Sequence, residues 1–172
     1  MTNKTLAIFE DGKLIQDAKG RRNFIRMIRS YQDSIICSKN SVYVITKKDG
    51  SLFIDANGNY EFDYADFNND GSTVTSNNDI AILTEKDGSL FTDYKGNTEF
   101  ENIHRYSVGG TETKTKGIYS ITEIDGSTFK DYKGNTEFEY AYRFADGSTE
   151  TKINNIRSCT NENGLDANVL PF

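Results

Sequence analysis

The chain has little of several residues on which enzyme and metal sites depend. Of its 172 residues, one is histidine, two are cysteine and none is tryptophan. Because His104 is the single histidine, paired-histidine metal sites are excluded and any Ser–His or Cys–His dyad would depend on one residue. Cys37 and Cys159 occupy different positions of the repeat described below, in no recognisable nucleophile context, which predicts two reduced thiols. We therefore expect no enzyme activity and no cofactor.

Long apolar runs are also absent. No window approaches 18 apolar residues, and Met1–Thr5 begins no apolar segment, which predicts neither a membrane span nor a signal peptide and favours the cytoplasm. The balance of 20 basic against 26 acidic residues disfavours general binding to nucleic acid or to an anionic membrane. Apolar residues make up 35% of the chain, which is enough for a core if they gather on one face of strands.

An internal repeat of 38 residues organises the chain. It is marked by four Asp-Gly pairs: Asp11-Gly12, Asp49-Gly50, Asp87-Gly88 and Asp125-Gly126. A copy this short cannot bury its own apolar face, so each copy must pack on its neighbours. We predict one all-β domain over residues 1–172, with copies at about 7–44, 45–82, 83–120 and 121–158 and a degenerate partial copy or tail at 159–172. Four copies exclude a β-trefoil.

Each copy is predicted to contain about four antiparallel strands. Asp-Gly between short β-rich runs indicates a two-residue turn with positive φ at both residues, here between Ile80–Glu85 and Ser89–Asp93. The Asp-x-x-Gly of residues 93–96 indicates a type I turn into a third strand, Thr98–Glu101. The fourth strand is the threonine-alternating run Thr73–Thr75.

Two-residue turns are expected to lead from this fourth strand to the next copy, at Asn77-Asn78, Lys116-Gly117 and Asn154-Asn155. Asp63–Gly71 is too long for a minimal hairpin, so the boundary between blades is predicted there. The copies then form a β-propeller-like ring or an open superhelical array. Pairing of Thr149–Ile153 with Lys4–Phe9 would close the ring, whereas continuation of the repeat through Ile156–Thr160 competes with closure.

Lys19–Gln32 departs from the pattern because it holds five of the twenty basic residues. Helical spacing of its apolar residues favours a short cationic helix, whereas the register of Phe24 with Phe62 favours a strand, and both remain open. A basic cluster on an acidic chain is suited to an acidic protein partner. The candidate partner-binding residues are Arg21, Arg22, Arg26 and Arg29.

Three further sets of residues are candidates for binding. Asp17, Asp55, Asp93 and Asp131 could form a ring of carboxylates, but Asp three residues before Gly favours turn capping. Asp66, Asn68 and Asp70 match the first half of a calcium loop, but the twelfth position is not glutamate, so we predict no metal site. The repeat-equivalent Tyr94 and Tyr132 are candidates for contacting a small ligand or sugar.

Ser51–Gly58, followed by Phe62, Tyr64, Ala65 and Phe67, resembles the WG (KWG) repeat family, with an aromatic-Ile-Asp run and a glycine three residues after the aspartate. The resemblance covers about residues 7–152, although the family's Trp-Gly dipeptide is replaced here, by Ser51-Leu52 in the second copy. Asp-Gly-Ser-Leu-Phe is also similar to choline- and glucan-binding repeats. Either resemblance implies a non-catalytic protein. We predict a protein-interaction or scaffolding module, with a small-molecule or carbohydrate binder with several equivalent sites as the alternative.

Overall fold

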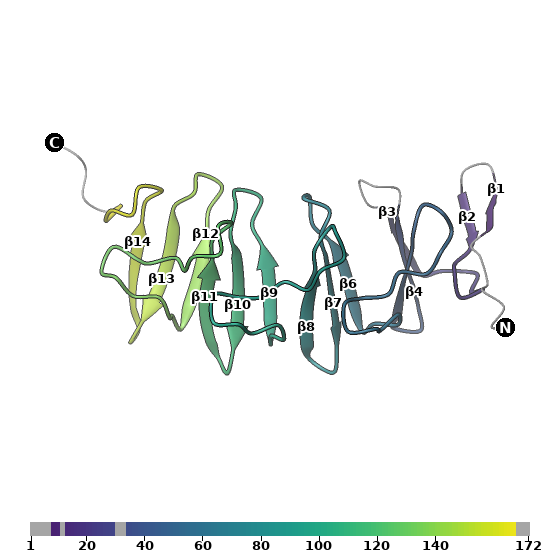
Figure 1. The fold of residues 1–172 in the computed structure, drawn as a ribbon, viewed down its shortest axis with the longest axis horizontal. Helices are drawn as coiled ribbons and strands as arrows, with labels where there is room; N and C mark the ends of the chain where they lie inside the picture. Colours follow the sequence, from purple (N-terminus) through teal and green to yellow (C-terminus); the bar gives the residue numbers. More distant parts are fainter. Residues whose placement is uncertain (1–7, 11–12, 30–33, 168–172) are drawn as a thin grey trace. The chain divides into compact units, whose positions relative to one another are not determined.

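The structure is a computed structural model that describes residues 8–10, 13–29 and 34–167, without the side chains of residues 8–10, 13–15, 26, 28 and 29. The chain forms two compact units, which are taken separately: unit 1 from Met1 to Phe91 and unit 2 from Thr92 to Phe172. Every regular element in the described residues is a β-strand (Figure 1). Those residues therefore contain no helix of the length and apolarity that a membrane span requires.

The described part of unit 1 contains one two-stranded and two three-stranded antiparallel sheets. The two-stranded sheet consists of β1 (Ile8–Glu10) and β2 (Lys13–Gln16). The first three-stranded sheet consists of β3 (Arg26–Arg29), β4 (Ile35–Lys39) and β5 (Val42–Thr46). The second consists of β6 (Tyr64–Phe67), β7 (Thr73–Asn77) and β8 (Ile80–Thr84).

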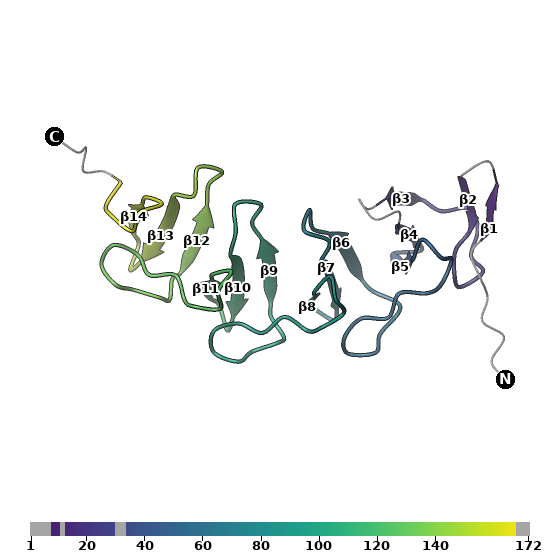
Figure 2. The same ribbon diagram turned by 45° about the horizontal axis from the view of Figure 1, so that its top comes forward.

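The described part of unit 2 contains two more three-stranded sheets, whose strands lie side by side in chain order (Figures 1 and 2). One consists of β9 (Asn102–Arg105), β10 (Thr111–Thr115) and β11 (Ile118–Thr122), and the other of β12 (Tyr140–Arg143), β13 (Thr149–Ile153) and β14 (Ile156–Thr160). The first strand of each three-stranded sheet begins 38 residues after the equivalent strand before it. The predicted all-β repeat fold is confirmed.

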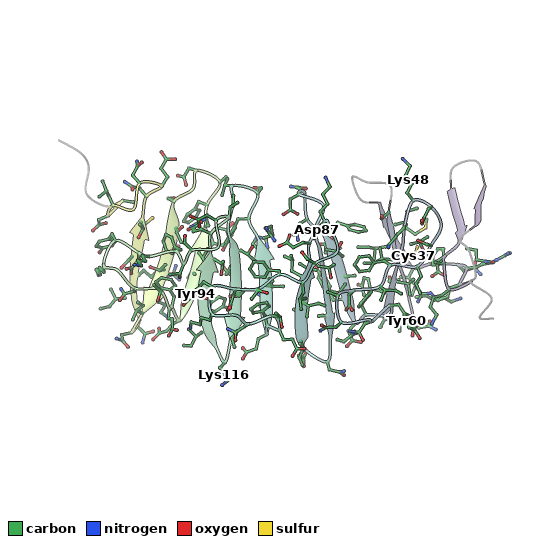
Figure 3. The ribbon with its side chains drawn as sticks, viewed as in Figure 1. Cys37, Lys48, Tyr60, Asp87, Tyr94 and Lys116 are labelled. Atoms are coloured by element: carbon green, nitrogen blue, oxygen red, sulfur yellow. The ribbon has the colours of Figure 1, made fainter. Side chains whose placement is uncertain are left out.

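Two-residue turns join the second and third strands of these sheets. In Asn78-Asp79 both residues have positive φ, 52° and 62°, as a type I′ turn requires. The predictions at Lys116-Gly117 and Asn154-Asn155 are confirmed, and Figure 3 shows Lys116 at the tip of the β10–β11 hairpin. In the second copy the prediction of Asn77-Asn78 was one residue early, because Asn77 still pairs within the sheet.

The Asp-Gly pairs form a different turn from the one predicted. The Gly88 N–H donates to the Glu85 carbonyl over 2.9 Å, and the Glu85 N–H donates to the Ser89 carbonyl over 2.8 Å. This is the pattern of a type I turn closed by a bulge, which needs a left-handed residue only at its glycine. Positive φ at Gly50, Gly88 and Gly126 is confirmed, but positive φ at the preceding aspartates was wrong.

The predicted division of a copy into strands was also wrong in part. Neither of two predicted strands, Ser89–Asp93 and Thr98–Glu101, is present. The chain instead forms a turn between them, which is closed by a hydrogen bond from the Asp93 N–H to the Asn97 carbonyl. Asp63–Gly71, expected to separate two blades, instead contains β6, with Ala65 buried and Tyr64 exposed. Each sheet consequently has three paired strands and crosses the predicted copy boundary.

The regular part of the basic segment Lys19–Gln32 is a β-strand. Arg26–Arg29 forms β3, which pairs with β4, and residues 19–29 contain no helix. Of the two alternatives that the sequence left open, the strand is correct over these four residues. Tyr31 and Gln32, at the end of the segment, lie outside the described residues.

The repeat continues through the last described strand. Ile156–Thr160 forms β14 and pairs with β13, which confirms the expected continuation. Because β12 pairs with its other edge, Thr149–Ile153 has no free edge for pairing with Lys4–Phe9, which was the alternative that the sequence left open. Most of Lys4–Phe9 lies outside the described residues.

Within each unit the apolar core lies between consecutive three-stranded sheets. In unit 1, Ile36 of β4 and Ile45 of β5 pack against Ala65 of β6 and Phe62 just before it. The equivalent cluster of unit 2 consists of Tyr106, Ile121, Phe138 and Ala141. The repeat-equivalent Phe62 and Phe138 are therefore inserted against the sheet that precedes each of them.

A buried aspartate closes the turn that follows each Asp-Gly turn. Asp93 Oδ1 accepts the N–H groups of Lys95 and Asn97 over 2.9 and 2.7 Å, and its Oδ2 accepts Asn97 Nδ2 over 2.8 Å. Asp131 makes the same three hydrogen bonds within 0.1 Å. The predicted capping role is confirmed, and the identical sequences 93–101 and 131–139 form the same turn.

A buried threonine joins this turn to the next copy. The N–H of the residue after each aspartate donates to the hydroxyl of a threonine 28 residues later: Ala18 to Thr46, Ala56 to Thr84, Tyr94 to Thr122 and Tyr132 to Thr160. These threonines are at most 3% exposed. We call this pair of features, the buried aspartate and the threonine acceptor, the Asp–Thr link.

Changing Thr122 to valine tests this link. Valine keeps the volume but removes the acceptor, and leaves the buried Tyr94 N–H unsatisfied. We expect the free energy of unfolding to fall by about 1–3 kcal/mol, measured by urea denaturation. Thr122→Ser keeps the hydroxyl and serves as the control. An equal loss in both variants would show that the hydrogen bond contributes nothing.

The bulged Asp-Gly turn makes a second prediction. Gly88 has a φ of 91° and open space where a Cβ would lie, so substitution there costs backbone strain alone. We expect Gly88→Val to destabilise the fold by about 1–3 kcal/mol and Gly88→Asn by less, because asparagine tolerates positive φ. Unchanged urea midpoints for the valine variant would contradict this conformation.

Candidate functional site

Arg21, the first of the predicted partner-binding residues, points into the fold. Its Nε donates to Asp17 Oδ2 over 2.6 Å, and its two terminal nitrogens donate to the Val42 and Cys37 carbonyls over 3.1 Å each. It stands where the later copies have the asparagine that completes the aspartate turn, Asn59, Asn97 and Asn135. The Arg21 guanidinium therefore neutralises the charge of the buried Asp17 carboxylate.

Arg22 is exposed, and its guanidinium donates to Gln16 Oε1 over 3.1 and 3.2 Å. Arg26 and Arg29 lie on β3, but their side chains are outside the described set. The basic partner-binding surface stays a prediction that depends on Arg22, Arg26 and Arg29.

Tyr94 and Tyr132, the predicted ligand contacts, occupy equivalent positions on the aspartate turns of unit 2, and Figure 3 labels Tyr94. Lys95 Nζ lies 5.4 Å from the centre of the Tyr94 ring, and Lys133 Nζ lies 5.1 Å from that of Tyr132. Lys95 also pairs with Glu137 of the next copy. Each ring already has a cation over it, and ligand contact by these tyrosines stays a prediction.

The residues of the half calcium loop are engaged in local hydrogen bonds. Asp70 Oδ1 accepts the N–H and hydroxyl of Ser72 over 2.9 and 2.6 Å, and Asn68 Nδ2 donates to the same hydroxyl. Asp66 accepts the Phe67 N–H and the Tyr64 hydroxyl. Across the described residues, no group of three or more His, Cys, Asp or Glu side chains could hold a metal ion.

Neither thiol is set up as a nucleophile. Burial, reinforced by the Asp17 carboxylate, raises the pKa of Cys37 to about 12, and burial also raises the pKa of Cys159. Both thiols are therefore protonated at neutral pH, whereas a nucleophilic cysteine needs a lowered pKa. His104 is exposed on β9, and its ring packs against Tyr106.

His104 belongs to a group of rings that unit 2 brings together from β9, β12 and the turns that follow them. The ring of Tyr106 lies edge-to-face with His104 at 4.8 Å and with Tyr142 at 6.1 Å. Tyr142 in turn lies 5.1 Å from Phe144. Tyr142 is 44% exposed and Phe144 39%. We call these four residues the aromatic cluster.

A buried carboxylate lies beneath the aromatic cluster. Glu112 is 7% exposed, lies directly opposite His104 in the sheet, and accepts a hydrogen bond from the Tyr106 hydroxyl. Burial raises the pKa of Glu112, and the hydrogen bond from Tyr106 partly opposes that effect. Burial and the Glu112 carboxylate together raise the pKa of the Tyr106 hydroxyl, which stays protonated and donates.

Sequence reasoning identified His104 but missed its neighbours. A comparison of the copies residue by residue would have pointed to this region. Glu112 and Glu150 stand at the repeat position where the earlier copies have Ile36 and Val74. A charged residue in an otherwise apolar repeat position marks a place where a copy serves another purpose than packing.

Each unit also contains a groove beside its Asp-Gly turns. The groove of unit 1 has a volume of about 570 Å³ and that of unit 2 about 760 Å³, with the repeat-equivalent Phe53 and Phe129 in their linings. In unit 2 the groove is also lined by Arg143, whose guanidinium donates two hydrogen bonds, of 2.6 and 2.8 Å, to the Glu123 carboxylate. The equivalent residue in unit 1 is Phe67, so the two grooves share a plan but differ in polarity.

Comparisons with known proteins identify no family. No protein-family model matches the chain, and no curated protein matches it. Among solved structures, the WD40 β-propeller domain of Doa1 is similar over 91% of this chain, at 11% identity and a TM-score of 0.37. This chain spans 57% of that chain's length.

The buried Glu112 predicts how stability depends on pH. A carboxyl whose pKa is raised by folding binds its proton more tightly in the folded state, so unfolding free energy increases as the pH falls from the raised pKa toward the ordinary value of 4.5. Glu112→Gln should therefore be more stable than the parent at pH 8, and the difference should shrink at pH 5.

Thermal melts from pH 8 to pH 5 measure this effect. Tyr106→Phe is the matched variant, since it removes the hydroxyl that stabilises the charged carboxylate and should steepen the pH dependence. Parallel pH profiles for the parent and Glu112→Gln would rule out a titrating Glu112.

Proposed function

We propose that this chain is a non-enzymatic protein-interaction module. The observation that carries the proposal is the contrast between a constant buried framework and variable exposed positions. The Asp–Thr link recurs in four copies, whereas the residues at one repeat-equivalent position, none of them buried, change from Asp66 to His104 to Tyr142. A repeat framework of this kind presents side chains without depending on their identity.

The resemblance to WG repeats supports the same proposal, since it implies a non-catalytic binding or scaffolding protein. The chemistry of the thiols agrees with it, because both cysteines have raised pKa values. A cytoplasmic location and an acidic protein partner for the basic segment remain part of the proposal.

Affinity capture with mass spectrometry tests the module. Reversing Arg22 and Arg26 to glutamate should abolish capture of an acidic partner. We expect the thermal midpoint to stay nearly unchanged, on the prediction that both charges lie at the surface, where charges contribute little to stability. The matched control reverses two exposed lysines elsewhere, Lys86 and Lys116, and should capture at full strength. Full capture by the arginine variant would show that the partner binds another surface of the chain.

A small-molecule or carbohydrate binder is the second candidate, and the two repeat-equivalent grooves favour it. Isothermal titration calorimetry against a panel of oligosaccharides would then give about two sites per chain, each lost on changing Phe53 or Phe129 to alanine. Binding that survives both substitutions would exclude the grooves.

A further inference from the structure

The aromatic cluster of unit 2 leaves ring surface open to solvent. Tyr106 is 6% exposed and holds its neighbours edge-to-face, so it orients them without being accessible itself. Tyr142 and Phe144 keep about two fifths of their surface exposed, and His104 is exposed as well. The faces of aromatic rings carry partial negative charge, which attracts cations placed over them.

Two carboxylates lie directly opposite ring residues in the sheets of unit 2. Glu112 is buried beneath the cluster, accepts a hydrogen bond from the Tyr106 hydroxyl and, among the described residues, forms no salt bridge. Glu150 lies directly opposite Tyr142 and is paired with Arg157. Asp146, two residues after Phe144, is exposed. A buried carboxylate without a cation is costly, and a bound cation would offset that cost.

Packing within the repeat does not require this arrangement. Unit 1 has Asp66 and Asn68 where unit 2 has His104 and Tyr106, and it has Val74 in place of Glu112. Its sheets stack through the same type of apolar cluster without these aromatic rings. Tyr106 belongs to the apolar cluster that stacks the sheets of unit 2, whereas Tyr142, Phe144 and Glu112 lie outside that cluster.

We propose that the aromatic cluster, with Glu112 beneath it, binds a basic side chain, arginine or lysine, of a protein partner. The planar guanidinium or the ammonium lies over the open rings, and the carboxylate supplies the opposite charge. The site deepens the proposed interaction function and rests on it, because it gives the chemistry of one contact that the partner would make.

Titration with blocked amino acids, followed by NMR, tests the site without a known partner. The probes are N-acetyl-arginine methylamide and N-acetyl-lysine methylamide, with N-acetyl-glutamate methylamide as the acidic counterpart. The basic probes should cause saturable shifts at His104, Tyr142 and Phe144, and the acidic probe should cause none. Absence of saturation, or equal shifts with the acidic probe, would overturn the proposal.

Two variants separate the site from the fold. Tyr142→Leu removes one open ring, and Glu112→Gln removes the charge while keeping the acceptor for Tyr106; each should weaken the basic probes by about 2- to 30-fold. The control is Tyr60→Ala, which removes a 43% exposed tyrosine in unit 1 that already lies beneath Lys19. Unchanged affinity in both cluster variants would overturn the proposed site. The proposal that the chain is an interaction module is tested separately, by the capture experiment.

Discussion

The buried aspartate of each copy, with the threonine acceptor that follows it, is the constraint on which the rest of the structure depends. Between β8 and β9 the chain runs from Glu85 to Glu101 without a strand, and a stretch of that length needs partners for its backbone groups. Asp93 accepts two N–H groups within its turn, and Thr122 of the next copy accepts the N–H of Tyr94. The link thereby fixes both the local turn and its attachment to the following sheet.

Because the Asp–Thr link holds the turns in place, residues at other positions of the repeat can differ between copies. Where the first copy has Arg21 instead of asparagine, the aspartate turn is kept and the arginine also reaches two carbonyls of the next sheet. In unit 2 the same freedom allows Glu112 and the aromatic cluster at positions that are aliphatic or polar in unit 1. Local polar closure of the turns maintains the fold, so individual packing positions can acquire new chemistry.

The sequence predicted the features that depend on short-range chemistry. The repeat, the capping aspartates and the left-handed glycines were all correct, because each is dictated by residues a few positions apart. The strand at Tyr64–Phe67 was missed because four residues give little periodicity and its pairing with β7 is a tertiary choice. The aromatic cluster was missed because Tyr106 and Tyr142 come from different copies and meet only in the folded unit.

Hydrogen exchange at individual amides tests the central role of the Asp–Thr link most directly. The amides of Ala56, Tyr94 and Tyr132 lie outside every strand, yet each donates to a buried threonine. The account predicts that they exchange as slowly as amides in the central strands β7, β10 and β13, because opening them requires separating two copies. Exchange as fast as in the exposed Asp-Gly turns would contradict the account.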